Sequence, residues 1–240
     1  EGGAYRAPSS PYRSWYDFDP KYKGGYRSWW GFETLPEVNE ENPSYVEFIT
    51  GEGGVIDTWL RRGAAGFRLD VADELPDDFI EKIRAAVKRV SPEKFLLGEV
   101  WEDATTKYGF GQRRTYLLGK GLDSVMNYPF KNAVLDFVKG KPAEQAMGEI
   151  LSICEHYPAP AMDTALNFLS THDTERALTV IADEPANGRG REWQSGRCVT
   201  GEAYEEGMLR LRMAYAIIYT LPGVPCLYYG CLLYTSPSPR

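Results

Sequence analysis

Two charged residues interrupt a stretch that otherwise has the pattern of a buried strand. In GFRLDVADELP, residues 66–76, three apolar side chains alternate with Arg68 and Asp70. Because successive side chains of a strand point to opposite faces, Arg68 and Asp70 share one face. Charged side chains are rarely buried unless they are paired or take part in chemistry. The Arg68–Asp70 pair is therefore a candidate site.

A second strand-like stretch, KFLLGEVW at residues 94–101, carries another acid. Glu99 shares a face with Leu97 and Trp101, and it occupies the position that Asp70 occupies on the preceding strand. Glycoside hydrolysis needs two such carboxyl groups, one to protonate the leaving oxygen and one to attack or to activate water. Taken alone, each acid also has a structural interpretation, as a helix cap or as an ion-pair partner of Arg68.

A third acid, Asp173, follows strand-like residues 165–171 within THDTER. Acids at the ends of successive strands are harder to explain by structure than any one of them. In a TIM barrel, the catalytic groups lie at the carboxyl ends of the strands.

The elements that must position these acids alternate between strand and helix. The predicted strands are residues 66–72, 94–101, 122–130 and 165–171, and the segment VPCLYYG. One helix is expected to begin at Asn42-Pro43 and to break at Gly51 to Gly54, and a second is expected to begin at Pro76. Further helices are expected in the segment that ends near residue 120, over 131–156 and over 206–220. A polar loop is expected at 183–205. This alternation predicts an α/β fold with a parallel sheet, either doubly wound or a barrel. No Gly-x-Gly-x-x-Gly stands at a strand–helix turn, so a dinucleotide site has no support.

Composition and net charge limit the classes of binding partner that are expected. The 240-residue chain has a net charge of −7 and no long basic run, so neither nucleic acid nor a membrane surface is an expected partner. No apolar run approaches a membrane span. The four cysteines lack metal-site spacing and are compatible with a cytoplasmic setting, although the first residue is not Met and secretion stays open. Many of the 6 Trp, 16 Tyr and 10 Phe lie in the first 32 residues, where they suit either sugar binding or packing.

Three segments, GFRLDVADE, LLGEVW and FLSTHDTER, resemble in order three motifs of the α-amylase family of glycoside hydrolases. LPEVN at residues 35–39, preceded by SWWGF, resembles an additional motif of that family. The details lean toward the neopullulanase, cyclomaltodextrinase and maltogenic amylase branch, and the resemblance covers nearly all of residues 15–230.

The resemblance implies a role for each site residue. Asp70 would be the nucleophile that forms a covalent glycosyl-enzyme, and Arg68 would hold it ionised. Glu99 would be the general acid and then the general base, with a pKa raised by a dry site and acidic neighbours. Asp173 would stabilise the oxocarbenium-like transition state. His172, Glu74 and Trp101 are expected to contact the substrate. The alternative for Glu74 is a helix cap, and the alternative for Trp101 is packing inside the barrel.

The resemblance also implies a partial (β/α)₈ barrel, comprising about strands 4 to 8. Residues 1–40 would be the end of a small loop-rich domain inserted after strand 3, and residues 41–230 the C-terminal part of the barrel. The family's third-strand motif is absent, so we expect two open sheet edges. Residues 231–240 depart from the family and look non-native.

The expected function is retaining hydrolysis of α-1,4 and perhaps α-1,6 glucosidic bonds in maltodextrins, cyclodextrins or pullulan. Alternatives are an α-glucan transglycosylase, an oligo-α-glucosidase or a sugar isomerase of the same superfamily, and a non-catalytic binding or transporter-partner homologue. No cofactor and no metal site is expected in this chain, with calcium and a homodimer left open for the full-length enzyme. His156 has no motif and is interpreted as structural.

Overall fold

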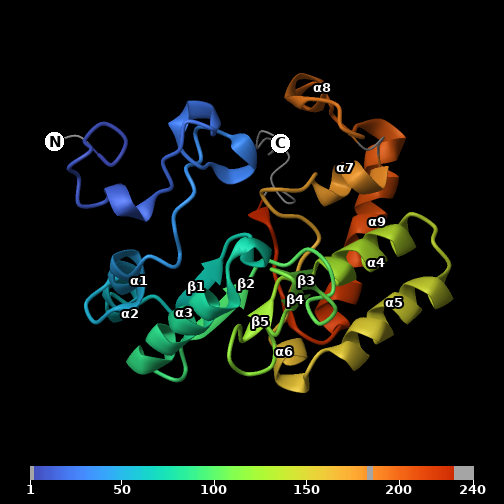
Figure 1. Ribbon diagram of the computed structural model, residues 1–240. Helices are drawn as coiled ribbons and strands as arrows, with labels where there is room; N and C mark the ends of the chain where they lie inside the picture. Colours follow the sequence, from blue (N-terminus) through green and yellow to red (C-terminus); the bar gives the residue numbers. More distant parts are fainter. Residues whose placement is uncertain (1–2, 183–185, 230–240) are drawn as a thin grey trace. The chain divides into compact units, whose positions relative to one another are not determined.

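The computed structural model describes residues 3–182 and 186–229, which form two compact units. The first unit runs to Phe67 and also includes Glu74–Leu96. The second comprises Arg68–Asp73 and the chain from Leu97 onward. The helices and strands of both units are labelled in Figure 1. The predicted non-native tail, residues 231–240, lies outside the described residues.

The first unit contains three α-helices and an irregular N-terminal segment. Its helical elements are η1 Arg13–Trp15, η2 Lys23–Gly25, η3 Trp29–Gly31, α1 Pro43–Thr50, α2 Val55–Arg61 and α3 Asp77–Val90. The Asn42 side chain caps α1 by accepting from the backbone N–H groups of Ser44 and Tyr45. This cap satisfies two N–H groups that have no partner inside the helix. The predicted helix start at Asn42-Pro43 is confirmed.

The helices of the first unit pack on one another through their apolar faces. The predicted break between α1 and α2 is present, and Gly53 lies in it with a φ of 76°. A positive φ strains most side chains but not glycine. On α3, Ile80, Ile83 and Val87 recur at helical spacing and are buried. Contacts join α1, α2 and α3 to one another, and this gives the unit its core.

Five short strands follow one another in space in the order of the chain. The strands are β1 Gly66–Leu69, β2 Phe95–Gly98, β5 Ser124–Val125, β6 Leu166–Asn167 and β7 Val224–Pro225, and a separate hairpin is formed by β3 Tyr108–Gly109 and β4 Gln112–Arg113. One sheet has the order β1-β2-β5, in which β2 and β5 are parallel, and β6 pairs with β7 in parallel (Figure 1). A parallel bridge from Met126 to Leu166 joins the two groups. The predicted strand–helix alternation with parallel pairing is confirmed.

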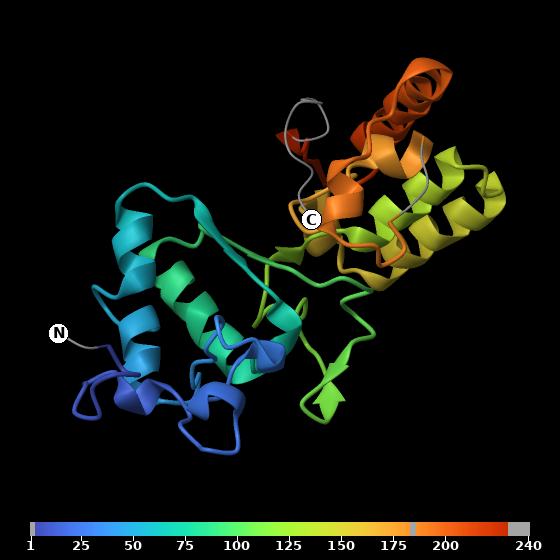
Figure 2. The same ribbon diagram turned by 90° about the horizontal axis from the view of Figure 1, so that it is seen from above.

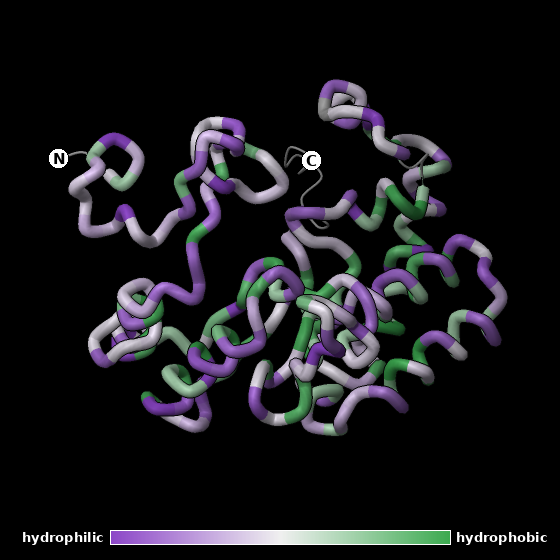
Figure 3. Tube along the Cα trace, viewed as in Figure 1, coloured by the Kyte–Doolittle hydropathy of each residue, from purple (hydrophilic) through white to green (hydrophobic). Residues whose placement is uncertain are grey.

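The second unit covers its strands with helices. These are α4 Tyr128–Val138, α5 Ala143–His156, α6 Ala159–Asp163, α7 Ala177–Ala182, α8 Arg191–Ser195 and α9 Gly201–Thr220, and η4 Ala72–Glu74 spans the boundary of the units. α4 and α5 lie side by side, and α4 and α7 both contact α9 (Figure 2). Hydrophilic and hydrophobic stretches alternate along these helices (Figure 3), as expected for helices packed on one face. Among the described residues, every helix is too short or too polar to cross a lipid bilayer.

Several predictions about local structure were wrong, including the polar loop at 183–205, which contains α8 and the start of α9. The helix expected to end near residue 120 is absent, since residues 101–120 contain no helix: glycines break the segment, and the β3–β4 hairpin turns at Phe110 and Gly111, both with positive φ. The strand expected over residues 122–130 stops early, since Asn127 caps α4. The helix expected over residues 131–156 is divided in two by Gly140, with a φ of 113°, and Pro142.

Candidate active site

Two of the three acids singled out by the sequence come directly after a strand. Asp70 follows β1 and Glu99 follows β2. The backbone N–H of Glu99 donates to the carbonyl of Leu69 at 2.9 Å, and the N–H of Ala72 donates to the carbonyl of Glu99 at 3.0 Å. This ladder holds the ends of the two strands at the same level. The strand at residues 66–72 is thus shorter than predicted, and Asp70 is the first residue beyond it.

Arg68 lies between the two carboxylates. Its Nη1 donates to Oδ1 of Asp70 at 2.6 Å. Its Nη2 lies 2.9 Å from Oε2 of Glu99, without the alignment of a hydrogen bond. The environments of the two acids differ strongly, because the side chain of Asp70 is 71% exposed and that of Glu99 is 3% exposed. One guanidinium group therefore links an exposed carboxylate to a buried one.

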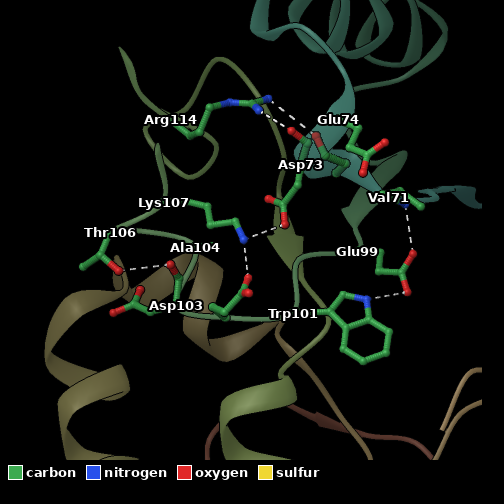
Figure 4. A network of polar contacts seen from close by, with 12 residues as sticks. Val71, Asp73, Glu74, Glu99, Trp101, Asp103, Ala104, Thr106, Lys107 and Arg114 are labelled. Carbon is green, nitrogen blue, oxygen red and sulfur yellow. Dashed lines mark hydrogen bonds and ion pairs between the residues drawn. The ribbon is translucent and has the colours of Figure 1, made fainter. Parts of the chain in front are cut away.

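Glu99 is surrounded by donors, as Figure 4 shows in part. Its Oε2 accepts from the backbone N–H of Val71 at 2.9 Å. Its Oε1 accepts from the indole of Trp101 at 3.1 Å and from the hydroxyl of Tyr128 at 3.2 Å. These groups all donate to the carboxylate form of Glu99, and both of its oxygens are fixed in place. A buried carboxylate without such partners would be strongly destabilising.

Val71 reaches Glu99 through a strained backbone conformation. Its φ is 43°, in the left-handed region that a β-branched residue seldom adopts. Such strain costs of order 1–3 kcal/mol and persists only where neighbouring contacts hold it. Here the strained turn directs the N–H of the residue after Asp70 at the carboxylate of Glu99. The backbone at the end of β1 thus takes part in positioning the second acid.

Tyr128, at the start of α4, donates to Glu99 from within an aromatic cluster. Its ring stacks on Trp101 with centroids 4.5 Å apart and planes 13° apart, and it meets Phe168 edge-on. Burial raises the pKa of Tyr128, and the negative charges of Glu99 and Asp173 raise this pKa further. The phenol therefore remains protonated at neutral pH and remains a donor.

His172 and Asp173 lie in the loop that follows β6. Nε2 of His172 is 3.0 Å from Oδ2 of Asp173, and the Asp173 side chain is 31% exposed. The hydroxyl of Thr171 accepts from the backbone N–H of Asp173 at 3.1 Å. This local bond fixes the turn, and it leaves part of the Asp173 carboxylate open to a ligand.

The two acids that follow Val71 in sequence have different partners. Asp73 accepts from Lys107 at 3.0 Å and from the Tyr116 hydroxyl at 2.9 Å, and it thereby anchors the loop after β2 (Figure 4). Glu74, in the first unit, accepts from the indole N–H groups of Trp29 and Trp30. Neither carboxylate caps α3, whose N-cap residue is Pro76.

Sequence reasoning missed Tyr128, Val71 and the partners of Glu74. Tyr128 was missed because it fell inside the strand predicted over residues 122–130, whereas it begins α4 after the short strand β5. Val71 had none, because its role belongs to its backbone. In the described ranges 3–182 and 186–229, no cluster of three or more His, Cys, Asp or Glu side chains is arranged to hold a metal ion.

Comparison with known proteins defines the class of the chain. Residues 12–233 match the family model "Alpha amylase, catalytic domain", and the chain belongs to the α-amylase family. This family has a TIM-barrel catalytic domain, which agrees with the parallel strands and their helices.

The chain is similar to an amylopullulanase, a cyclomaltodextrinase and a pullulan hydrolase. An amylopullulanase from Thermoanaerobacter thermohydrosulfuricus is 34% identical over 95% of this chain and 16% of its own length. A cyclomaltodextrinase from a Bacillus species is 33% identical over 83% of this chain and 30% of its own length. Among solved structures, the type III pullulan hydrolase from Thermococcus kodakarensis has a TM-score of 0.74 at 27% identity, over 93% of this chain and 36% of that one. The chain spans less than a third of the two sequence relatives.

Proposed function

We propose that the protein is a retaining glycoside hydrolase that cleaves α-glucosidic bonds in maltodextrins, cyclodextrins or pullulan. The observation that carries the proposal is the arrangement of one exposed and one buried carboxylate on a single arginine, at the ends of neighbouring strands. The names of the relatives, which include amylopullulanase and cyclomaltodextrinase, support the substrate class.

In this proposal, Asp70 attacks the anomeric carbon while Glu99 protonates the leaving oxygen. The leaving sugar takes the proton of Glu99, and a glycosyl ester forms on Asp70. In the second half-reaction, Glu99 takes a proton from water, the hydroxide oxygen bonds to the anomeric carbon, and the ester to Asp70 breaks. The donors around Glu99 suit this second half, in which Glu99 acts as a base.

The separation of the acids is compatible with the proposal. Two carboxyl oxygens that contact the same planar guanidinium group lie within roughly 8 Å of each other. That range includes the ~5–5.5 Å of retaining enzymes and the lower part of the ~6.5–9.5 Å of inverting ones. The retaining assignment therefore rests on the family and not on this geometry alone. Asp173 and His172 would form hydrogen bonds with hydroxyls of the sugar in the same subsite.

We also propose that the five parallel strands are strands 4 to 8 of the barrel. Residues 1–40 would then end an inserted subdomain, and residues 41–230 would form the C-terminal part of the barrel. A parallel barrel closes with eight strands in this family, so activity requires the remaining strands. The activity experiments below use the chain expressed with those strands, and we call this form the complete-barrel protein.

Trapping the intermediate tests the proposed function. The complete-barrel protein is incubated with a slow fluorinated α-glucosyl donor and digested, and the peptides are analysed by mass spectrometry. The expected result is a glucosyl adduct on Asp70. The variant Asp70→Asn keeps the shape of the site and should bind maltotriose but not turn it over. An adduct on another residue overturns the assignment of the nucleophile.

A further inference from the structure

The segment around Trp29 and Trp30 is a tight turn tied at both ends. Ser28 bridges Pro36, and the backbone N–H of Trp29 donates to the carbonyl of Leu35 at 2.9 Å. Within the turn, the N–H of Phe32 donates to the carbonyl of Trp29 at 3.0 Å. These bonds leave little freedom for the backbone that carries the two tryptophans.

Trp30 is unusual in two respects. Its φ is 51°, so a bulky aromatic residue adopts the left-handed conformation. Its side chain is also 74% exposed, which leaves most of a large apolar surface in water. Both features are unfavourable for folding, because one costs conformational energy and the other gains no burial. A strained and exposed tryptophan therefore calls for an explanation outside packing.

Glu74 fixes the two indoles against each other. Its Oε2 accepts from Nε1 of Trp29 at 2.5 Å, and its Oε1 accepts from Nε1 of Trp30 at 2.9 Å. The rings are stacked, with centroids 4.7 Å apart and planes 16° apart. All three residues belong to the first unit. Since an indole has a single polar donor, this carboxylate occupies the only polar group of each ring.

With both N–H groups occupied, the pair offers a ligand only a flat apolar face in a fixed orientation. Pyranose rings fit such a face, because one side of the ring presents C–H groups while its hydroxyls point outward to water. We propose that the exposed face of Trp30 is a stacking subsite for a glucosyl unit of an α-glucan, and that Glu74 is the positioning residue that holds the platform. The choice of an α-glucan rests on the proposed function.

This inference gives Glu74 a role different from direct sugar contact. Both oxygens of its carboxylate already accept from the indoles, so the sugar meets the ring and not the acid. Replacing Glu74 should therefore weaken binding by releasing the rings. A rigid aromatic surface binds more tightly than a mobile one, because less freedom is lost on association.

A fluorine label provides a direct test in the whole 240-residue chain. The chain carries Asp70→Asn to prevent turnover and 5-fluorotryptophan at every tryptophan, and the resonance of Trp30 is assigned from the variant Trp30→Phe. On titration with maltoheptaose, the Trp30 resonance should shift saturably, whereas cellohexaose, a β-glucan, should leave it unchanged. A Trp30 resonance that stays unmoved by maltoheptaose overturns the inference.

Variants supply the quantitative test, with maltoheptaose affinity measured by calorimetry. Trp30→Ala should weaken binding about 10-fold, and Trp30→Phe, which keeps a flat ring, should weaken it less. Glu74→Ala should resemble Trp30→Ala. The matched control is Trp59→Ala, which removes another exposed tryptophan, 52% exposed on α2, and should change nothing.

The outcomes separate this inference from the proposed function. Equal affinities for the parent chain and Trp30→Ala overturn the platform while leaving Asp70 as nucleophile. An adduct on a residue other than Asp70, together with a saturable Trp30 shift, overturns the proposed mechanism and leaves the platform standing.

Discussion

Glu99 and Glu74 accept hydrogen bonds from the same kind of donor in contrasting surroundings. Glu99 receives the indole N–H of Trp101 in a site where the acid is 3% exposed. Glu74 receives the indole N–H groups of Trp29 and Trp30 at the surface. In the buried case, the fixed side chain is the acid itself. At the exposed site, Glu74 holds the two indoles in place.

The difference shows how burial changes the effect of a hydrogen bond between an indole and a carboxylate. A desolvated carboxylate responds strongly to each donor and charge around it, since electrostatic interactions are stronger where water is excluded. An exposed carboxylate is partly screened, and its bonds contribute mainly geometry. We therefore expect substitutions at Glu99 to affect the chemical step, and substitutions at Glu74 to affect binding.

The largest expected effect is that of Glu99→Gln in the complete-barrel protein. It removes the proton donor while keeping the size of the side chain, so kcat/KM on maltotriose should fall about 10³-fold. Steady-state kinetics measure this loss. Substrates with activated leaving groups should recover part of the glycosylation rate, because they need less protonation. An equal loss on both kinds of substrate would contradict a role as general acid.

A smaller effect is expected from Tyr128→Phe. The change removes one hydroxyl from Oε1 of Glu99 and leaves the stacked ring on Trp101 in place. Loss of a hydrogen bond to a charged group costs about 1.5–3 kcal/mol, so kcat should fall roughly 10- to 100-fold. The control is Tyr157→Phe, which removes a buried hydroxyl that contacts Ala104 instead. An unchanged kcat in Tyr128→Phe would remove Tyr128 from the site.

Glu74→Ala should change KM and not kcat. If the acid only holds Trp29 and Trp30, its loss should raise KM for long maltodextrins by up to about 10-fold and change kcat by less than about 2-fold. Glu74→Gln should be milder, because its amide oxygen still accepts from one indole. Kinetics on maltotriose and maltoheptaose distinguish the two parameters. A fall in kcat comparable to that of Tyr128→Phe would place Glu74 in the chemical step and end the contrast with Glu99.

The smallest effect concerns stability and is absent at neutral pH. Burial raises the pKa of Tyr128 and of Tyr157 above the unfolded value of about 10. The folded state then keeps protons that the unfolded state releases, so the free energy of unfolding should fall as pH rises above about 10. Each tyrosine contributes up to about 1.4 kcal/mol per pH unit. Urea unfolding at several alkaline pH values should show a shallower fall in Tyr157→Phe, and an unchanged slope would contradict burial of this phenol.

Much of the fold followed from local patterns in the sequence. The Asn42-Pro43 helix start and the apolar spacing of α3 depend on short-range rules, and both were predicted. The errors lay where glycine or proline ends an element that the apolar residues alone would continue. Gly140 and Pro142 divide a helix that composition alone would continue, and the β3–β4 hairpin has too few residues to show a period of two.

The candidate site was only partly predictable, for a related reason. Side-chain alternation placed Arg68 and Asp70 on one face, and strand-end positions singled out Glu99. The hydrogen bond from the Val71 backbone carries no residue preference, so no pattern could reveal it. Glu74 was expected to contact sugar or cap a helix. Its two indole partners are distant in sequence, and only the folded chain brings them to it.

The left-handed turn at Val71 ties the movements of the two acids together. The peptide group between Asp70 and Val71 belongs to the backbone of the first acid, and its N–H is bonded to the carboxylate of the second. Rotating that peptide plane moves the backbone of Asp70 and, through the hydrogen bond, displaces the carboxylate of Glu99. A change in the backbone that carries the first acid therefore also changes the hydrogen bonding of the second.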